Sequence, residues 1–310
     1  MYSILVTIPV NEKQKNVLEN AGEGCQFLYE TNSELARKLI PEADIIIGNV
    51  PAQEIQASPK LKLLQLQSAG TDGYTNAGVL SENTVLTNAT GAYDKSVAEH
   101  GLALTLMLQK NFHLYRSLQI QNSWKDLGLA SSIADSVVLI VGFGSIGSLY
   151  AKMVKSLGAT VIGIKRRKTE KPDVLDELYT MEQLDTVLPR ADVIFSVLPN
   201  TKDTRYIYTI ERFSLMKPSA IFINCGRGNA VSEEVLTEVL RNKTIRAAAS
   251  DVFEQEPLSL DSPLWTLDNF MITPHTAGGN HLPDTQDKII SIAAQNIRAE
   301  IGRASCRERV

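Results

Sequence analysis

The stretch Val137-Val-Leu-Ile-Val-Gly142-Phe-Gly144-Ser-Ile-Gly147 decides the fold of this chain. A short apolar run leads into a G-x-G-x-x-G frame, and a helical pattern, Ser145–Leu157, begins inside that frame. In such a turn the first glycine permits the tight bend and the second lets a pyrophosphate approach the backbone. The third lets the helix pack closely on the strand. The context predicts a dinucleotide site with phosphates at the helix N-terminus, whereas the alternative is a purely structural turn.

Strand and helix patterns alternate on both sides of this turn. The expected strands are Ile4–Ile8, Gln26–Tyr29, Asp44–Ile47, Leu61–Leu66, Thr84–Leu86, Val137–Val141, Thr160–Ile164, Val193–Val197, Ile221–Asn224, Ala247–Asp251 and Phe270–Ile272. The other expected helices include Glu12–Asn20, Ser33–Leu39, Asp94–Gln119 and Pro283–Glu300. Such alternation implies parallel sheets covered on both faces. Because it restarts at Val137, we predict an α/β protein with two doubly wound parallel-sheet domains, a Rossmann cofactor domain inserted into a flavodoxin-like substrate domain.

The expected domain boundaries follow from the same alternation. We expect the substrate domain to begin with residues 1–94, the dinucleotide-binding domain to comprise residues 95–281, and a C-terminal helix, 282–299, to return to the substrate domain. Residues 300–310 are polar and basic and have no apolar period. A DNA string that resembles a common sequencing adapter can encode them. We therefore expect a non-native tail there, and the alternative is a genuine disordered terminus.

Composition excludes several classes of protein. A chain of 310 residues with 44% hydrophobic residues can form two domains with a large core, and a net charge of −4 gives no nucleic-acid-binding footprint. No apolar run approaches the ~20 residues that span a bilayer, and the N-terminus lacks the basic region of a signal peptide. The three cysteines have no metal-type spacing and their odd number suits no disulfide framework. We expect a reduced, cytoplasmic chain without metal, membrane or nucleic-acid partners.

The end of the expected strand Thr160–Ile164 indicates which dinucleotide binds. An NAD site usually has an Asp or Glu at this point, which holds the ribose hydroxyls. This chain instead continues with Lys165-Arg-Arg-Lys168, and its first acid is Glu170. Guanidinium groups bind a 2′-phosphate through charge-assisted hydrogen bonds, which a carboxylate would repel. We predict NADP as the preferred cofactor, with NAD as an alternative, and the contacts Lys165, Arg166 and Arg167. The other interpretation is a solvated basic loop.

Three stretches after the glycine turn suggest chemistry: Asn224-Cys-Gly-Arg227-Gly, Asp251-Val-Phe-Glu-Gln-Glu256-Pro and Ile272-Thr-Pro-His275. Reduction of a 2-keto acid needs a hydride at C2 and a proton at the keto oxygen. His275 suits the proton because its charge changes near neutral pH, and a carboxylate such as Glu256 favours the protonated imidazole. Arg227 can pair with the substrate carboxylate and polarise the ketone. Each stretch alone is a common structural feature, but together they predict catalytic roles for Arg227, Glu256 and His275.

At these residues the chain resembles the D-isomer-specific 2-hydroxyacid dehydrogenases, from the loop Gln67–Tyr74 to Asn296. The further motifs that carry the resemblance are Ser96-Val-Ala-Glu99, Leu198-Pro-Asn-Thr201 and Met216-Lys217. The resemblance implies reduction of a small 2-keto acid, such as glyoxylate or hydroxypyruvate, to a D-2-hydroxy acid. In that family the Arg, Glu and His at these positions are catalytic.

The resemblance also implies the remaining contacts. The backbone N–H groups of Ala69 and Gly70, with Arg227, would bind the substrate carboxylate, and Asp251 would contact the nicotinamide carboxamide. The other cofactor contacts that it implies are Gly142, Gly144, Ser145, Ile146, Gly147, Leu198, Pro199 and Cys225. Trp124 and Tyr74 could line the pocket, with core packing as the default expectation for both. A homodimer is implied, with the long helix after Asp94 as a contact.

Three alternative functions stay open. Formate dehydrogenases share the fold, but they carry an amide where this chain has Glu256, and formate needs no proton donor. A phosphoglycerate dehydrogenase-like enzyme without a C-terminal regulatory domain also fits the motifs. A nicotinamide-sensing binding protein on the same fold keeps the three catalytic residue types, so turnover of a keto acid would distinguish it from an enzyme.

Overall fold

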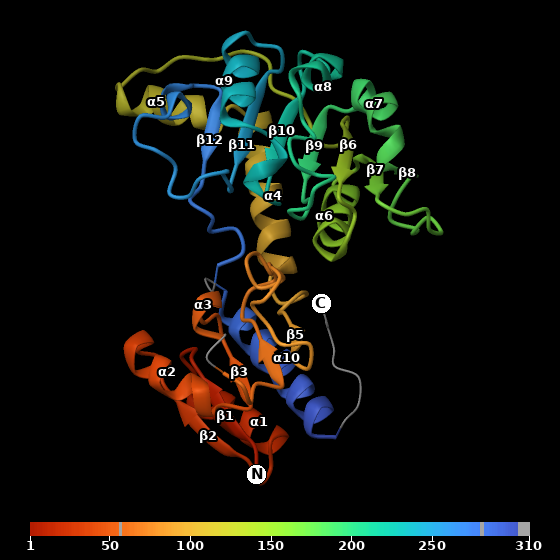
Figure 1. The fold of residues 1–310 in the computed structure, drawn as a ribbon. Helices are drawn as coiled ribbons and strands as arrows, with labels where there is room; N and C mark the ends of the chain where they lie inside the picture. Colours follow the sequence, from red (N-terminus) through yellow and green to blue (C-terminus); the bar gives the residue numbers. More distant parts are fainter. Residues whose placement is uncertain (56–57, 280–281, 303–310) are drawn as a thin grey trace. The chain divides into compact units, whose positions relative to one another are not determined.

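The computed structural model describes residues 1–55, 58–279 and 282–302. It divides the chain into two compact units: unit 1 comprises residues 1–93 with 280–310, and unit 2 comprises residues 94–279. In each unit helices connect most of the strands of a parallel sheet (Figure 1). Unit 2 is therefore inserted in sequence into unit 1, and the fold is the predicted pair of doubly wound α/β domains.

Unit 1 has a five-stranded parallel sheet in the order β2-β1-β3-β4-β5, which is the flavodoxin-like order. Its strands are β1 (Ser3–Val6), β2 (Gln26–Tyr29), β3 (Ile45–Ile47), β4 (Leu63–Gln65) and β5 (Val85–Thr87). Its helices are α1 (Glu12–Ala21), α2 (Ser33–Leu39), α3 (Ala52–Ile55) and α10 (Pro283–Ile301), with the 3-10 turn η1 (Ile40–Glu42). The central strand β3 consists of three buried isoleucines. Such a continuous apolar run is expected where helices cover both faces of a parallel sheet.

The last helix, α10, packs against α1 and the sheet of unit 1. Its apolar residues Ile289, Ala293 and Ile297 enter the core, and the buried Asn296 donates from Nδ2 to Gln65 Oε1 at 2.6 Å. The helix continues past the expected end at residue 299, and Ile301 packs on the same core. Residues 303–310, to which the rest of the tail prediction applies, lie outside the described residues.

Unit 2 has a seven-stranded parallel sheet in the order β12-β11-β10-β9-β6-β7-β8. The strands are β6 (Val137–Val141), β7 (Thr160–Lys165), β8 (Glu177–Thr180), β9 (Val193–Ser196), β10 (Ile221–Asn224), β11 (Ala247–Ser250) and β12 (Phe270–Ile272). Because β6 pairs with β7 on one side and β9 on the other, the strand order reverses there. Open α/β sheets bind ligands at the carboxyl ends of strands beside such a switch point.

Helices cover both faces of this sheet (Figure 1). They are α4 (Asp94–Gln109), α5 (Phe112–Ile120), α6 (Ser145–Ser156), α7 (Leu184–Val187), α8 (Ile210–Leu215) and α9 (Glu233–Arg241). Short 3-10 turns are η2 (Met181–Gln183), η3 (Leu188–Arg190), η4 (Gly228–Ala230) and η5 (Pro263–Thr266). The helix α4 packs on α6, β10 and β11, while α7, α8 and α9 contribute to the apolar core on the opposite face.

The expectation of one helix over Asp94–Gln119 is wrong, because the segment forms two helices, α4 and α5. Asn111 between them has φ 56°. Arg246, at the start of β11, donates to the carbonyls of Leu108 and Gln109 at 2.9 and 3.2 Å and to Asn111 Oδ1 at 2.8 Å. A cation that satisfies the last carbonyls stabilises a helix end. This partner is distant in sequence, so the apolar pattern cannot indicate the break.

Candidate active site

The predicted cofactor and catalytic residues of unit 2 lie along one edge of its sheet. All strands are parallel, so their carboxyl ends meet at the same edge. Gly142 follows β6, Leu198 follows shortly after β9, Cys225 follows β10, Asp251 follows β11, and His275 follows shortly after β12. Residues that are far apart in the chain are thus gathered by the order of the strands.

The glycine turn has the geometry that the motif predicts. Gly142 has φ 94°, and a Cβ there would lie 2.8 Å from the carbonyl oxygen of Val197. A Cβ on Gly147 would lie 3.0 Å from Ile140 Cγ2, so this glycine lets α6 pack closely on β6. Around Gly144 the nearest atom to a Cβ is 4.0 Å away, which leaves the backbone open to a ligand.

The N-terminus of α6 is suited to an anion. The first N–H groups of a helix, here those of Ser145 and Ile146, have no partner within the helix. Gly144 at the N-cap has no side chain that could accept from them. Free N–H groups and the positive end of the helix dipole together favour a phosphate. This geometry supports the predicted pyrophosphate contacts.

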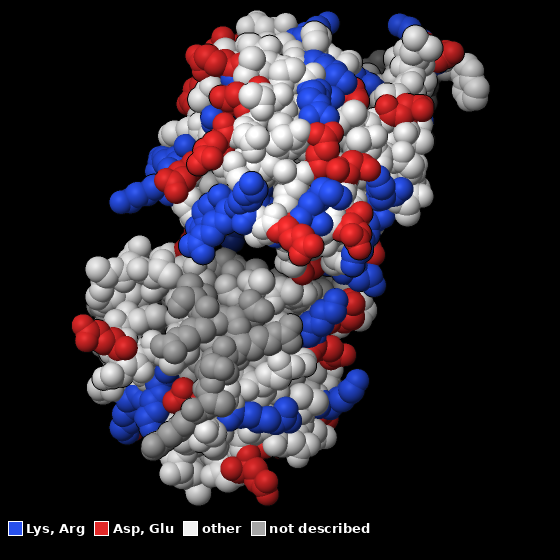
Figure 2. All heavy atoms as spheres, turned by 90° about the vertical axis from the view of Figure 1, so that its right-hand side faces the viewer, with Lys and Arg blue, Asp and Glu red and all other residues white. Residues whose placement is uncertain are grey.

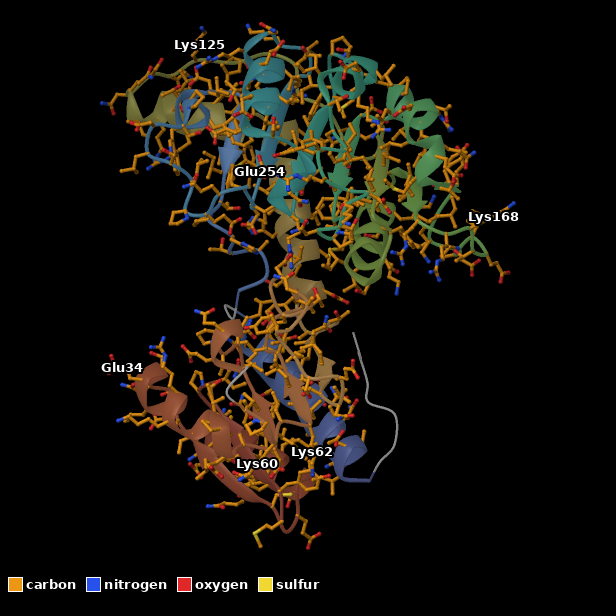
Figure 3. The ribbon with its side chains drawn as sticks, viewed as in Figure 1. Glu34, Lys60, Lys62, Lys125, Lys168 and Glu254 are labelled. Carbon is orange, nitrogen blue, oxygen red and sulfur yellow. The ribbon has the colours of Figure 1, made fainter. Side chains whose placement is uncertain are left out.

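The basic cluster at the end of β7 lies next to the glycine turn. Lys165 places its Nζ 5.9 Å from the ring centroid of Phe143 within the turn. Arg166 and Arg167 are exposed, and Lys168 lies at the tip of the following loop (Figure 3). In the part of the chain that the structure describes, none of these last three has an ion-pair partner. On the face shown in Figure 2, basic and acidic side chains are interspersed.

Glu256 and His275 form a hydrogen-bonded pair. His275 Nδ1 lies 2.6 Å from Glu256 Oε2, and because an ionised carboxylate only accepts, Nδ1 is the donor. The other oxygen, Oε1, accepts from the backbone N–H of Phe253 at 2.8 Å, which fixes the carboxylate. The side chains are 48% and 34% exposed for His275 and Glu256 respectively. Nε2 of His275 has no hydrogen-bond partner among the described residues.

Asp251 holds the turn that carries His275. The carbonyl oxygen of Asp251 accepts from the His275 N–H at 2.8 Å. Its carboxylate, in a residue that is 2% exposed, accepts from the N–H groups of Thr276 and Ala277 at 2.9 and 3.0 Å and from Thr273 Oγ1 at 2.6 Å. These bonds support the uncommon φ of His275, 52°. Asp251 therefore shapes the turn that carries His275, besides its predicted cofactor contact.

Arg227 lies in a loop that two glycines bring against neighbouring loops. A Cβ on Gly226 would lie 2.5 Å from the backbone nitrogen of Leu198, and one on Gly228 would lie 1.9 Å from the carbonyl carbon of Phe253. Only glycine fits at either position. The Arg227 loop is therefore packed against the loops after β9 and β11, the second of which carries Glu256. Arg227 Nη1 donates to the Gly226 carbonyl at 2.9 Å.

The remaining predicted cofactor contacts lie after β9 and β10. Leu198 and Cys225 are buried, and Pro199 is exposed. Burial, and then the charge of Asp251, raise the pKa of the Cys225 thiol well above its usual range. Because the thiolate is the nucleophile, a thiol that stays protonated is inert. The structure thus gives no support for nucleophilic chemistry at Cys225, and its contact with the cofactor stays a prediction.

Ala69 and Gly70 lie in unit 1, in the loop that follows β4. Side chains donate hydrogen bonds to the carbonyl oxygens of this loop. Asn88 Nδ2 donates to the carbonyl oxygen of Ala69 at 2.8 Å, and Ser68 Oγ donates to that of Gly70 at 2.7 Å. Within the described residues, the N–H groups of Ala69 and Gly70 donate to no acceptor. The loop therefore presents free donors, as binding of a carboxylate requires.

Two polar side chains near Asp251 are not predicted from the sequence. Thr273 binds Asp251, and His100 in α4 places Nε2 3.0 Å from Thr273 Oγ1. A hydroxyl in the same stretch as His275 is a signal that could have identified Thr273. Nothing in the pattern of α4 distinguishes His100, because its partner lies on another part of the chain.

The described residues, 1–55, 58–279 and 282–302, show neither a metal cluster nor a membrane-spanning helix. Within them no cluster of three or more His, Cys, Asp or Glu side chains could hold a metal ion. No helix in these ranges combines the length and the apolar character that crossing a membrane requires. Cys25 and Cys225 are free thiols.

Comparisons with known proteins identify relatives of the whole chain. A family model described as D-isomer specific 2-hydroxyacid dehydrogenase, NAD binding domain, matches residues 102–277. D-3-phosphoglycerate dehydrogenase of Methanocaldococcus jannaschii is 32% identical over 303 residues, which are 96% of this chain and 57% of that protein. Glyoxylate/hydroxypyruvate reductase B of Shigella boydii is 30% identical over 268 residues, 84% of this chain and 82% of that protein.

A solved structure is similar over the full length. It is the crystal structure of a D-isomer specific 2-hydroxyacid dehydrogenase family protein from Aeromonas salmonicida, which is 32% identical with a TM-score of 0.88. The match covers 100% of this chain and 98% of that chain. The two parallel-sheet domains thus have a known fold.

Proposed function

Because the chain belongs to the D-isomer-specific 2-hydroxyacid dehydrogenases, NAD(P)-dependent oxidoreductases that act on a CH–OH group, we propose that it reduces a small 2-keto acid. The product is the D-2-hydroxy acid, and glyoxylate and hydroxypyruvate are the proposed substrates. The observation that carries the proposal is the Glu256–His275 pair, 2.6 Å apart, at the sheet edge that also bears the glycine turn. A proton donor at a dinucleotide site is what ketone reduction requires.

The residues present fit a nicotinamide dinucleotide. The turn at Gly142 and the first N–H groups of α6 suit its pyrophosphate, and the buried carboxylate of Asp251 suits its carboxamide. When bound, the dinucleotide supplies the hydride for C2 of the substrate. Placement and proton delivery remain the tasks of the protein.

We assign these tasks to the three catalytic candidates. Arg227 pairs with the substrate carboxylate and polarises the ketone. His275 donates the proton from Nε2 to the keto oxygen, and Glu256 at Nδ1 orients the imidazole and favours its protonated form. The free N–H groups of Ala69 and Gly70 are proposed as further donors to the substrate carboxylate.

NADP is the proposed preferred cofactor. Lys165, Arg166 and Arg167 follow directly on β7, and the first acid comes only at Glu170. The two guanidinium groups are exposed beside the glycine turn, without an ion-pair partner among the described residues. They can therefore bind a 2′-phosphate without breaking an existing contact.

One assay tests the reaction and its alternatives. Purified protein is tested with glyoxylate, hydroxypyruvate and bulkier 2-keto acids, with NADPH and with NADH, and with 3-phosphoglycerate and the oxidised cofactors. We expect turnover of the small keto acids with NADPH and a D-configured product where the product is chiral. Turnover of 3-phosphoglycerate alone would instead favour a phosphoglycerate dehydrogenase. Dinucleotide binding without any turnover would contradict an enzyme and favour a nicotinamide-sensing protein.

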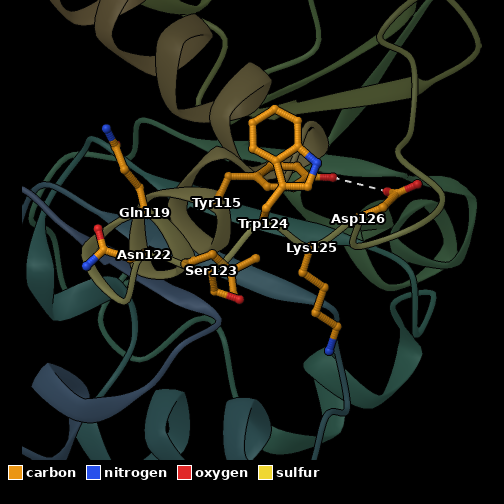
Figure 4. A pocket seen from close by; sticks show the side chains of 8 residues that line it. Tyr115, Gln119, Asn122, Ser123, Trp124, Lys125 and Asp126 are labelled. Atoms are coloured by element: carbon orange, nitrogen blue, oxygen red, sulfur yellow. Dashed lines mark hydrogen bonds between the residues drawn. The ribbon is translucent and has the colours of Figure 1, made fainter.

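A homodimer is the proposed assembly. The predicted contact is the long helical segment after Asp94, and within it we propose α5 with the following loop. Phe112, Ile120, Trp124 and Leu129 expose 59%, 68%, 102% and 97% of their surface. The expectation that Trp124 packs in the core is therefore wrong, whereas Tyr74 is partly buried against the core of unit 1. Trp124 lies beside Tyr115 over a cavity of about 710 Å³ (Figure 4).

Exposed apolar surface of this kind marks interaction sites, and a second copy would cover it. Light scattering should give the mass of a dimer for the parent protein and a lower mass for Trp124→Glu. A monomeric parent protein would contradict the assembly.

The cytoplasm is the proposed compartment. Cys25 and Cys225 are free thiols, and a reducing compartment keeps thiols in that state. Fractionation of cells that express a tagged chain should recover it with cytoplasmic markers, and recovery with secreted markers would contradict the proposal.

A further inference from the structure

The hydroxyl of Thr273 lies between His100 and Asp251. His100 Nε2 is 3.0 Å from Thr273 Oγ1, and Thr273 Oγ1 is 2.6 Å from Asp251 Oδ1. The direct distance from His100 Nε2 to Asp251 Oδ1 is 3.8 Å, so the hydroxyl mediates the contact. The three side chains come from α4, the end of β12 and the end of β11, all within unit 2.

The donors in this chain of hydrogen bonds follow from the chemistry of the groups. Both oxygens of Asp251 accept from backbone N–H groups, those of Thr276 and Ala277, as an ionised carboxylate does. Thr273 has one hydroxyl proton and gives it to this carboxylate. Its oxygen must then accept from His100 Nε2, which therefore carries a proton. This direction holds for the neutral Nε2–H tautomer and for the imidazolium alike.

The two carboxylate oxygens of Asp251 accept different numbers of hydrogen bonds. Oδ1 accepts from Thr273 and from Thr276. Oδ2 accepts from Ala277, which is its single donor among the described residues. A carboxylate oxygen can accept two hydrogen bonds, so Oδ2 keeps room for one more donor. That capacity suits the N–H of a carboxamide.

We propose that His100 is a positioning residue for the nicotinamide end of the site. Its N–H fixes the Thr273 hydroxyl, which holds Asp251 Oδ1 and so aims Oδ2 at the carboxamide. The inference rests on the proposed function in one respect, the contact between Asp251 and the carboxamide. Without His100, the Thr273 hydroxyl keeps its bond to Asp251 but loses the donor on its other side, so Asp251 is held less firmly.

Packing alone does not account for a histidine at this place. The buried residues around it on α4 are small or apolar, such as Val97, Ala98 and Leu104. The His100 side chain is 23% exposed, and its one hydrogen bond among the described residues is the one to Thr273. A leucine of similar bulk would suit the helix as well, so a substitution can separate the hydrogen bond from the packing.

The experiment measures discrimination at the carboxamide. The acetylpyridine analogue of NADPH carries a methyl group in place of the amide nitrogen and so cannot donate to Asp251. Calorimetry gives the Kd of both nucleotides for the parent protein, His100→Leu, Thr273→Val and His100→Gln. We expect His100→Leu and Thr273→Val to weaken NADPH roughly tenfold and the analogue little. His100→Gln keeps an N–H donor and should restore most of the affinity.

His113→Leu is the matched control, because this histidine lies in α5 of the same unit and has no contact with Asp251 among the described residues. Its NADPH-to-analogue ratio should equal that of the parent protein. Equal weakening of both nucleotides by His100→Leu, or no rescue by His100→Gln, would overturn the inference, as would a parent protein that does not discriminate. Binding is measured without turnover, so a parent protein that discriminates but reduces no keto acid would contradict only the proposed reaction.

Discussion

The end of the site at β6 and β7 and the end at β11 and β12 are built in different ways. The first consists of a turn, a helix N-terminus and a strand end that follow one another between Gly142 and Lys168. The second joins side chains from α4, β11 and β12 around the buried Asp251. The first end thus depends on local backbone and charge, and the second on a hydrogen-bond network that exists only after folding. Substitutions at the first end should therefore affect dinucleotide binding. At the second end, His275 and Glu256 should affect the chemical step, and His100 and Thr273 the binding of the carboxamide.

The largest effect is expected from His275→Ala at the network end. The substitution removes the proposed proton donor, and general acid catalysis is typically worth ~10²–10⁴-fold in rate. Steady-state kinetics should show that loss in kcat, while calorimetry shows NADPH binding close to that of the parent protein. His275 is assigned no contact with the dinucleotide, so a parallel loss of NADPH affinity would contradict its role as the proton donor alone.

Arg166→Asp and Arg167→Asp test the other end. Each replaces a proposed phosphate partner with a repelling charge, and a hydrogen bond to a charged group is worth about 1.5–3 kcal/mol, or roughly tenfold to a hundredfold in Kd. NADPH binding should weaken by that amount, and NADH binding far less. Lys168→Asp, at the tip of the same loop, is the matched control for a general change of charge. Equal losses for the two nucleotides would show that these arginines do not contact the 2′-phosphate.

Glu256→Gln should be milder than His275→Ala, because the proton donor remains. The amide can still accept from His275 Nδ1 but lacks the charge that favours the imidazolium. The imidazole then loses its proton at lower pH, so the alkaline fall in keto-acid reduction should move to lower pH. The pH dependence of kcat provides the measurement. A profile identical to that of the parent protein would contradict the role of Glu256.

The smallest effect is expected from Cys225→Ala between the two ends. Burial, and then the charge of Asp251, raise the pKa of this thiol, so it stays protonated at neutral pH and takes no part in proton or group transfer. Only the fit of the buried wall changes, and kcat should stay within about threefold of the parent value, which corresponds to under ~1 kcal/mol. A loss as large as that of His275→Ala would mean that the thiol has a chemical role.

Local patterns determined the fold class and the family. The expected strands Gln26–Tyr29, Val137–Val141 and Ile221–Asn224 coincide with β2, β6 and β10, and the last two are nearly continuous apolar runs, typical of buried parallel strands. The turn at Gly142 was recognisable for the same reason, because its requirements are local. The roles of the individual site residues stay predictions.

Interactions between residues that are distant in sequence determine the features of the fold and of the site that no sequence pattern predicts. The edge strand β8 is not predicted, because it is only half-buried along its length and its apolar pattern is weak. The end of α4 is not predicted either, because the residue that stabilises it, Arg246, lies at the start of β11. The order of motifs singles out Glu256 and His275, but only the folded sheet brings His275 Nδ1 within 2.6 Å of Glu256 Oε2 and places Thr273 and His100 against Asp251. Hydrogen bonds depend on which strand ends become neighbours, and that is set by the packing of the whole sheet rather than by any segment of it.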